Sequence, residues 1–217
     1  MKSDRELQVD VLEELRWEPG VNATDIGATV KDGVVTLEGT VDSFAEKWAA
    51  VNAVKRLPGV KALAVDLKVE LPGSSERTDT DIARAAESAL KWDVLVPHDR
   101  IKVTVENGRL TLEGEVDRQF QKSAAERAVI HLTGVKGVTN LITVKPKVAP
   151  SEVKEKIEAA FKRNAILDAN QIKVQVEGAK VTLSGSVGTW AEREQAEDAA
   201  WAAPGVSEVK SDITILY

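Results

Sequence analysis

The histidines and paired carboxylates are the side chains of this chain that could carry acid–base or metal chemistry. The sequence has two histidines, His98 and His131, and no cysteine. Neither histidine belongs to a cluster with the spacing of metal ligands. Adjacent carboxylates such as Glu13 and Glu14 have the pattern of a solvated helix face, and no glycine-rich loop with a phosphate-binding pattern is present. We therefore expect no enzymatic activity, no metal site and no cofactor.

Basic residues near the middle of the chain are candidates for binding an anion. The net charge of −6 divides as −4, 0 and −2 over residues 1–71, 72–146 and 147–217. Electrostatics therefore favours the middle segment for an anionic phospholipid headgroup, and the alternative is that these side chains only balance local Asp and Glu. No basic stripe is present, so nucleic acid binding is not expected. The candidate residues are Arg84, Lys91, Arg118, Lys122 and Arg127, together with Lys102.

Aromatic residues on one predicted helix form a second apolar stripe. Positions 44, 48, 51 and 55 lie about 140° from the core stripe of a regular helix, and an exposed apolar stripe usually marks a partner. Three partners are open: another part of this chain or a second chain, the preceding helix, or a membrane or foreign protein surface that favours tryptophan. The predicted interaction residues are Phe44, Trp48 and Val51 near the start of the chain, and Trp190 and Trp201 near its end.

Two further tryptophans, Trp17 and Trp92, occupy equivalent places at the end of a predicted helix. Because two parts of the chain share this residue, we expect it to close the edge of a domain. Lipid contact at this helix is the alternative.

All of these residues belong to a unit that occurs three times. The segment Val35-Thr36-Leu37-Glu38-Gly39 returns at residues 110–114 and 181–185, with offsets of 75 and then 71 residues. Such a period indicates tandem domains rather than one core. We predict domains at residues 1–71, 72–146 and 147–217. Glycines recur in the same register and are expected to define the fold: Gly39, Gly114 and Gly185, then Gly59, Gly134 and Gly205.

Periodicity within each unit predicts the order helix, strand, strand, helix, strand. The first helix has apolar residues four apart, such as Leu7, Val11 and Leu15. Two strands with alternating apolar residues follow, joined by Asp32-Gly33 or Asn107-Gly108 turns. An alanine-rich helix comes next, starting at capping boxes such as Ser43-x-x-Glu46, or near Asp117 in the second unit.

The recurring glycines have predicted backbone roles. Gly39 and its equivalents interrupt the second strand, which suggests a bulge, a bend or a helix crossing too close for a side chain. Gly59 and its equivalents are expected to be left-handed caps that end the second helix. Between the units, residues 71–77 read as a flexible linker and residues 145–150 as one stiffened by two prolines. We therefore expect units two and three to be the more rigidly related pair.

The combination of an alternating strand, an Asn/Asp-Gly turn, the pattern Val-Thr-Leu-x-Gly-x-Val and a capped alanine-rich helix resembles the BON domain, three times over. The resemblance implies an α+β fold of three tandem αββαβ domains, each with two helices on one face of a three-stranded mixed sheet. Resembling proteins are mostly envelope stress proteins for which phospholipid binding is the usual inference. Others are cytosolic, including one that senses potassium. The family carries no catalytic residues.

These observations predict a non-enzymatic binding module of bacterial osmotic or envelope stress that binds phospholipid membranes peripherally. The alternatives are a protein interaction or self-association scaffold and cytosolic potassium sensing. The N-terminus has no signal-peptide pattern, and no apolar run reaches the roughly 18 residues of a membrane span. We therefore expect a cytoplasmic protein.

Overall fold

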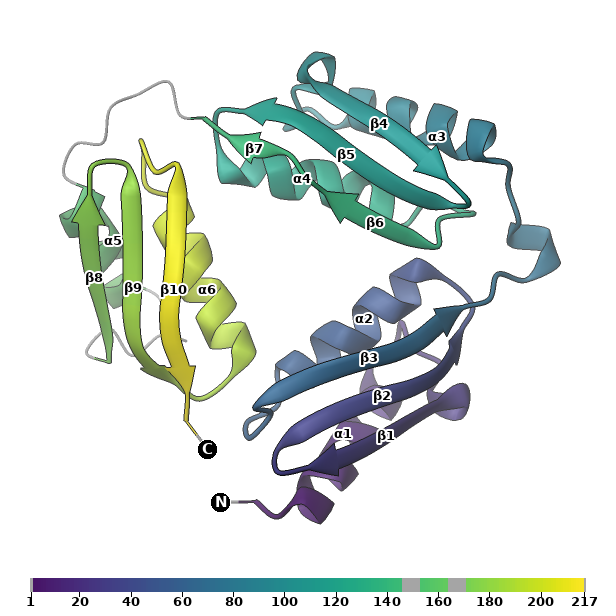
Figure 1. Cartoon of the computed structure of the whole chain (residues 1–217), viewed down its shortest axis with the longest axis horizontal. Helices are drawn as coiled ribbons and strands as arrows, with labels where there is room; N and C mark the ends of the chain where they lie inside the picture. Colours follow the sequence, from purple (N-terminus) through teal and green to yellow (C-terminus); the bar gives the residue numbers. More distant parts are fainter. Residues whose placement is uncertain (1, 146–152, 164–170, 217) are drawn as a thin grey trace.

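Three α+β units follow one another along the chain (Figure 1). The computed structural model describes residues 2–145, 153–163 and 171–216. Unit one contains α1 (Asp4–Trp17), β1 (Ile26–Lys31), β2 (Val34–Val41), α2 (Phe44–Lys55) and β3 (Ala62–Val69). Unit two contains α3 (Asp79–Trp92), β4 (Ile101–Glu106), β5 (Arg109–Val116), α4 (Gln119–Ile130), β6 (Gly137–Asn140) and β7 (Thr143–Val144). Unit three contains α5 (Val153–Arg163), β8 (Ile172–Glu177), β9 (Lys180–Val187), α6 (Trp190–Trp201) and β10 (Glu208–Ile215).

Each sheet is mixed, and its middle strand is the one that carries the repeated motif. In unit one, β1 pairs antiparallel with β2, and β2 pairs parallel with β3. Units two and three repeat this arrangement, with β5 and β9 in the middle. The predicted fold class, with two helices on one face of a three-stranded mixed sheet, is confirmed.

The third strand of unit two departs from the prediction because it is broken into β6 and β7. The side chain of Asn140 donates from Nδ2 to the carbonyl of Lys122 at 3.0 Å, and its Oδ1 accepts from the amide of Ile142 at 3.2 Å. These bonds compete with the strand ladder. Units one and three have Val65 and Ser211 at the equivalent position and keep a continuous strand.

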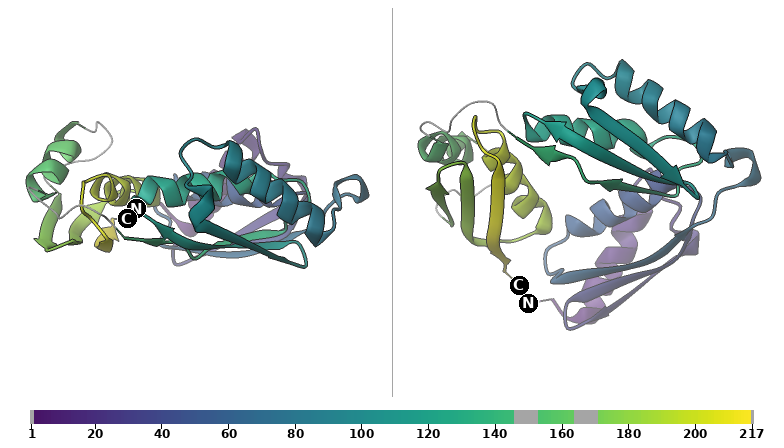
Figure 2. Two further views of the ribbon diagram at one scale, coloured as in Figure 1. Left: turned by 90° about the horizontal axis from the view of Figure 1, so that it is seen from above. Right: turned by 45° about the horizontal axis from the view of Figure 1, so that its top comes forward.

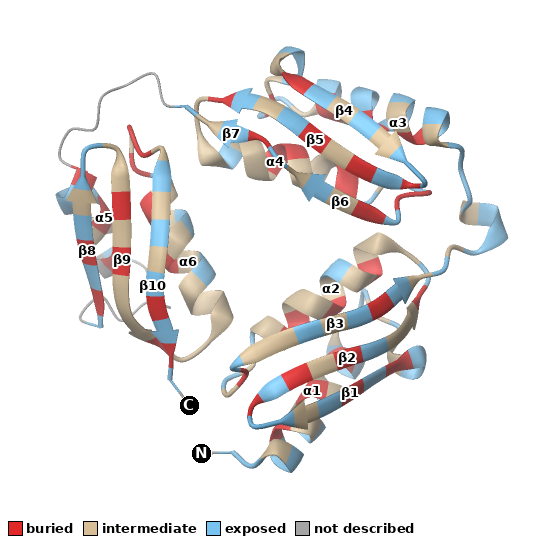
Figure 3. Ribbon diagram, viewed as in Figure 1, coloured by how far each residue is buried: buried red, intermediate tan, exposed pale blue. Residues whose placement is uncertain are grey.

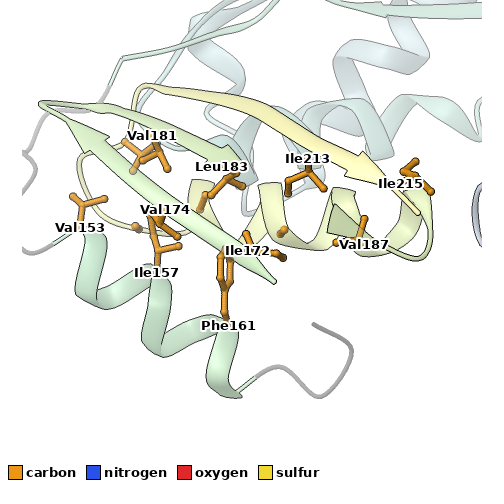
Figure 4. Close-up of a cluster of buried hydrophobic side chains, with 14 residues drawn as sticks. Val153, Ile157, Phe161, Ile172, Val174, Val181, Leu183, Val187, Ile213 and Ile215 are labelled. Carbon is orange, nitrogen blue, oxygen red and sulfur yellow. The ribbon is translucent and has the colours of Figure 1, made fainter. Parts of the chain in front are cut away.

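Each unit has its own apolar core between the helices and one sheet face (Figure 3). In unit three, Phe161 of α5 is buried beside strand residues such as Leu183 and Ile213 (Figure 4). The apolar positions predicted on the first helix of unit one, Leu7 and Val11 among them, are fully buried.

Hairpin turns join the first two strands, as the Asp-Gly and Asn-Gly dipeptides predicted. Asp32 and Gly33 both have positive φ, 53° and 78°, and Asn107 and Gly108 have 52° and 75°, as type I′ turns require. In units one and two, an aspartate at the start of the first helix holds this turn: the Asp79 carboxylate accepts from the amides of Asn107 and Gly108, both at 2.8 Å. Sequence periodicity gave no signal for this contact.

The motif glycines are required by the close approach of a backbone carbonyl group. Gly39 has φ of 131°, and a Cβ there would lie 2.0 Å from the backbone oxygen of Asp25, which precedes β1. Gly114 and Gly185 show the same approach, at 2.1 and 1.9 Å. In units one and two this carbonyl belongs to the last residue of a one-turn 3-10 helix, Ala23–Asp25 or His98–Arg100, and in unit three it belongs to Gln171. Gly59 also has positive φ, 96°, but it lies beyond the end of α2 in the turn toward β3, so it is not the cap itself.

The three units surround a common centre, and the described ends of the chain lie near each other (Figures 1 and 2). The second helices, α2, α4 and α6, lie on the inner side of the three sheets (Figure 1). Each unit contacts both of the others, as the next section shows. The prediction that a proline-containing linker fixes units two and three concerns residues 145–150, of which only Lys145 belongs to the described residues.

Candidate ligand and interaction sites

The basic residues predicted to bind an anion divide between two separate cavities of unit two. Arg84 and Lys91 line a cavity of about 640 Å³ between α3 and β4. Arg118 and Arg127 line a cavity of about 350 Å³ where unit two meets unit three. Two candidates remain: Lys122 contributes its backbone carbonyl to the hydrogen bond from Asn140, and Lys102 is exposed on β4.

The first cavity, here called the α3/β4 groove, has an apolar floor and a charged rim. Leu90 and Ile101 are buried in the floor. Beside the basic side chains Arg84 and Lys91 stand Glu87 and Asp99, and His98 completes the rim. An apolar floor with a few convergent polar groups is the usual form of a ligand site, and here the rim combines both signs of charge.

Unit one fills the equivalent groove with its own side chains. Gln8 stands where unit two has Ala83, and its Nε2 donates to the carbonyl of Ala28 on β1 at 2.7 Å. Leu12, in place of Glu87, packs against the core. The smaller Ala83 leaves this space open in unit two.

A turn beside the groove displays large apolar side chains to solvent. Trp92 is 85% exposed, Val94 95% and Leu95 48%. Asp93 orders this turn, because its carboxylate accepts from the amide of Leu95 at 2.9 Å. Trp92 therefore does not close the domain edge, and neither does Trp17, which is 83% exposed. The sequence prediction named Trp92 but not Val94 and Leu95. The signal that could have found them is the occurrence of three large apolar residues within four positions.

The predicted aromatic stripe lies where the units meet. Phe44, the first residue of α2, packs against the core of unit two. Trp190, the equivalent residue of α6, packs against the core of unit one and donates from Nε1 to the carbonyl of Val60 at 2.9 Å. Lys55 and Glu194 form an ion pair of 2.5 Å at the same interface. Of the alternatives left open by the sequence, these contacts match coverage by another unit of the same chain.

The other stripe residues are less enclosed. Trp48 is 41% exposed and Val51 is half-buried. Trp201 lines the cavity between units two and three. An external partner could therefore reach Trp48, whereas Phe44 and Trp190 are already in contact with neighbouring units.

No set of three or more His, Asp or Glu side chains in the described residues is arranged to hold a metal ion. His98 lies 4.0 Å from Asp99 on the rim of the groove, and His131 lies at the interface of units one and two. None of the helices in the described ranges has both the length and the apolarity needed to cross a bilayer.

Comparison with known families identifies the repeated unit. The BON domain matches residues 3–70, 78–146 and 151–217. The chain belongs to the BON-domain family. One curated relative is osmotically-inducible protein Y of Escherichia coli (strain K12). It is 34% identical over 129 residues, which cover 58% of this chain and 64% of that protein. The match thus spans less than two thirds of the relative. These matches indicate no catalytic family.

Solved structures resemble this three-domain BON chain only weakly. The C-terminal domain of CdsD, a structural protein of the type III secretion system of Chlamydia trachomatis, aligns over 100% of both chains with 14% identity and a TM-score of 0.28. The periplasmic domain of PrgH aligns over 96% of this chain and 100% of that one, with 12% identity and a TM-score of 0.22. No functional inference is taken from either.

Proposed function

We propose that this protein is a non-enzymatic component of a bacterial osmotic stress response that attaches peripherally to anionic phospholipid surfaces through its second BON domain. The observation that carries the proposal is the position of the rim cations Arg84 and Lys91 beside the exposed Trp92–Leu95 turn. Lys91 and Trp92 are the last two residues of α3, so a cation and an exposed indole lie at the same end of this helix. Membrane interfaces favour this pairing, because tryptophan has an amphipathic ring and anionic headgroups attract lysine and arginine.

Charge supports the second unit over the other two. It is electrically neutral overall, whereas the first and third carry −4 and −2. The first unit presents an equally exposed tryptophan, Trp17, but has Pro19 and Gly20 in place of Val94 and Leu95. The role in osmotic stress is supported by the named relative, osmotically-inducible protein Y.

Vesicle flotation at low salt tests the proposal. Wild-type protein should float with phosphatidylglycerol vesicles and much less with phosphatidylcholine vesicles. Arg84→Gln combined with Lys91→Gln removes two charges worth about 1 kcal/mol each near an anionic surface, so partitioning should fall roughly 30-fold. Trp92→Ala should weaken it roughly tenfold through lost apolar burial. Wild-type protein that stays unbound would refute the proposal.

Two control variants test whether binding depends on the charge of the rim and on the second unit. Glu87→Gln removes a negative charge from the same rim and should strengthen vesicle binding several-fold. Trp17→Ala removes an equally exposed indole from the acidic first unit and should change binding less than twofold. Equal losses in Trp17→Ala and Trp92→Ala would show that the second unit is not preferred.

Protein assembly is a second candidate because Trp48 stays 41% exposed beside an inter-unit contact. Trp48→Ser should then abolish any concentration-dependent association seen by analytical ultracentrifugation. Potassium sensing stays a prediction from the family resemblance. Titration of potassium against tryptophan fluorescence and melting temperature tests it, and an unchanged signal would contradict it.

A further inference from the structure

The three contacts between units are built from equivalent residues in a cyclic order. The second helices of the three units are α2, α4 and α6, and the first residue of each faces the C-terminal end of the second helix in the next unit. Phe44 of α2 meets the Ile130 end of α4, and Trp190 of α6 meets the Lys55 end of α2. By the same rule, Gln119 of α4 faces the Trp201 end of α6, and both residues line one cavity. The repeat therefore places an aromatic residue at two interfaces and a glutamine at the third.

This substitution coincides with a larger cavity. The cavity at the interface of units one and two, where Phe44 lines the wall, has a volume of about 140 Å³, whereas the cavity lined by Gln119 has a volume of about 350 Å³. That volume is within the range of small-molecule sites. Smaller amide and hydroxyl groups, from Gln119 and Ser123, occupy the wall instead.

The wall of this cavity combines cations with aromatic surface. Arg118 and Arg127 come from unit two, Asp198 and Trp201 from unit three, and Phe120 is 52% exposed at its edge. Two guanidinium groups against one carboxylate leave a net positive charge of one. Arginine suits phosphate and carboxylate ligands because its planar fork donates several hydrogen bonds, and it also stacks on flat rings.

We propose that the cavity between units two and three binds a small organic anion of single negative charge, with its acidic group facing Arg118 and Arg127 and its flat apolar part against Trp201. Asp198 repels a second negative charge, which disfavours polyanions. The ligand joins residues of two units, so its binding stabilises their contact, as any ligand specific for the folded arrangement must. This site is separate from the α3/β4 groove and does not depend on membrane attachment.

A fluorescence titration of the full chain with 1-anilinonaphthalene-8-sulfonate tests the proposal, because this probe is an aromatic monoanion. Wild-type protein should show one saturable site. The uncharged analogue N-phenyl-1-naphthylamine, which lacks the sulfonate, should bind at least tenfold more weakly. Equal affinity for the two probes would overturn the proposal, because it would mean that apolar surface alone is recognised.

Substitutions then locate the site. Gln119→Phe gives unit two the aromatic residue of unit one, so it should remove the saturable site while the melting temperature stays at or above that of the wild type. Arg118→Gln combined with Arg127→Gln should weaken binding at least tenfold, and Asp198→Asn should strengthen it. If Gln119→Phe and the double arginine variant both titrate like the wild type, the proposal is wrong.

Matched variants at the other cavity distinguish this ligand from a lipid headgroup. Arg84→Gln with Lys91→Gln should leave the probe titration unchanged, and Gln119→Phe should leave flotation with phosphatidylglycerol vesicles unchanged. Loss of both signals in either variant would show that the two cavities serve one lipid ligand, and the small-anion proposal would then be abandoned.

Discussion

Gly114 illustrates how a single atom can decide whether a BON unit folds. A Cβ at this residue would lie 2.1 Å from the backbone oxygen of Arg100, and the φ of 147° is unfavourable for any L side chain. Both the clash and the strain arise in backbone, which cannot rotate away as a side chain can. The same geometry at Gly39 and Gly185 explains why the motif glycine recurs in each unit.

Gly114→Ala is therefore expected to destabilise unit two by about 3 kcal/mol or more. Gly73→Ala is the matched control, because no atom lies within 4 Å of its added Cβ, and it should change stability by less than about 0.5 kcal/mol. Urea unfolding, monitored by amide hydrogen exchange in α3 and β5, measures the change in stability for both variants. Similar losses in the two variants would contradict the carbonyl explanation.

Asp198 carries a pH-dependent contribution at the interface of units two and three. Burial raises the pKa of its carboxyl, repulsion from Glu194 and Glu197 adds to the rise, and Arg127 opposes it. A carboxyl with a higher pKa when folded binds its proton more tightly in the folded chain. Its ionisation therefore lowers stability as the pH rises from the unfolded pKa of about 3.9 through the folded pKa.

Asp198→Asn should accordingly stabilise the chain at pH 7, by about 0.5 kcal/mol because the side chain remains partly exposed. The gain should vanish below about pH 3.9, where the wild-type carboxyl is protonated in both states. Thermal unfolding of the two proteins across this pH range provides the measurement. A stabilisation that is independent of pH would point to a cause other than ionisation.

At the scale of elements, the first helix and the hairpin turn of a unit are linked by an aspartate. The Asp79 carboxylate accepts two backbone amide hydrogens from the turn between β4 and β5, and Asp4 does the same in unit one at 2.7 and 3.0 Å. These bonds attach the start of α3 to the end of the sheet at which β4 turns into β5. The third unit has Pro150 at this position.

Asp79→Ala leaves two turn amides without this charged acceptor and should destabilise unit two by about 1–3 kcal/mol. The amides of Asn107 and Gly108 should exchange faster with solvent, while the equivalent turn of unit one keeps its protection. Asp66→Ala, at an exposed position of β3, serves as the control and should be nearly neutral. An unchanged exchange rate of the Asn107 amide in Asp79→Ala would contradict the role of Asp79 in holding this turn.

At the scale of the whole molecule, the contact between units three and one closes the cyclic arrangement. Trp190 contributes apolar packing and an indole hydrogen bond to Val60, and the Lys55–Glu194 ion pair flanks it. A unit of roughly 70 residues has a small core, so burial between units adds stability that one unit cannot supply.

Trp190→Ala should open this interface without unfolding the sheets. We expect a larger radius of gyration by small-angle X-ray scattering and faster amide exchange in α2 and α6, with α4 less affected. Trp17→Ala removes a tryptophan that is 83% exposed and should leave the scattering unchanged. An unchanged radius of gyration in Trp190→Ala would mean that the other contacts suffice to hold the arrangement.

Sequence by itself determined the three-fold repeat, the order of elements, the mixed α+β fold and residues of the core such as Leu7 and Val11. These features follow from periodicities within a single element, because residues on one face of a helix are three or four positions apart and those on one face of a strand are two apart. The broken third strand at Asn140 was missed because it depends on a carbonyl group of a different element.

Only the tertiary structure decided which surfaces of the units meet and where the cavities lie. The basic candidates were assigned from the sequence to one segment of the chain, but Arg84 and Arg118 line separate cavities of it. Trp190 and Val60 are far apart in the chain, and no local pattern records their contact. The physical reason is that a core is specified by repetition within one element, whereas an interface depends on single residues, such as Gln119, meeting side chains from another unit.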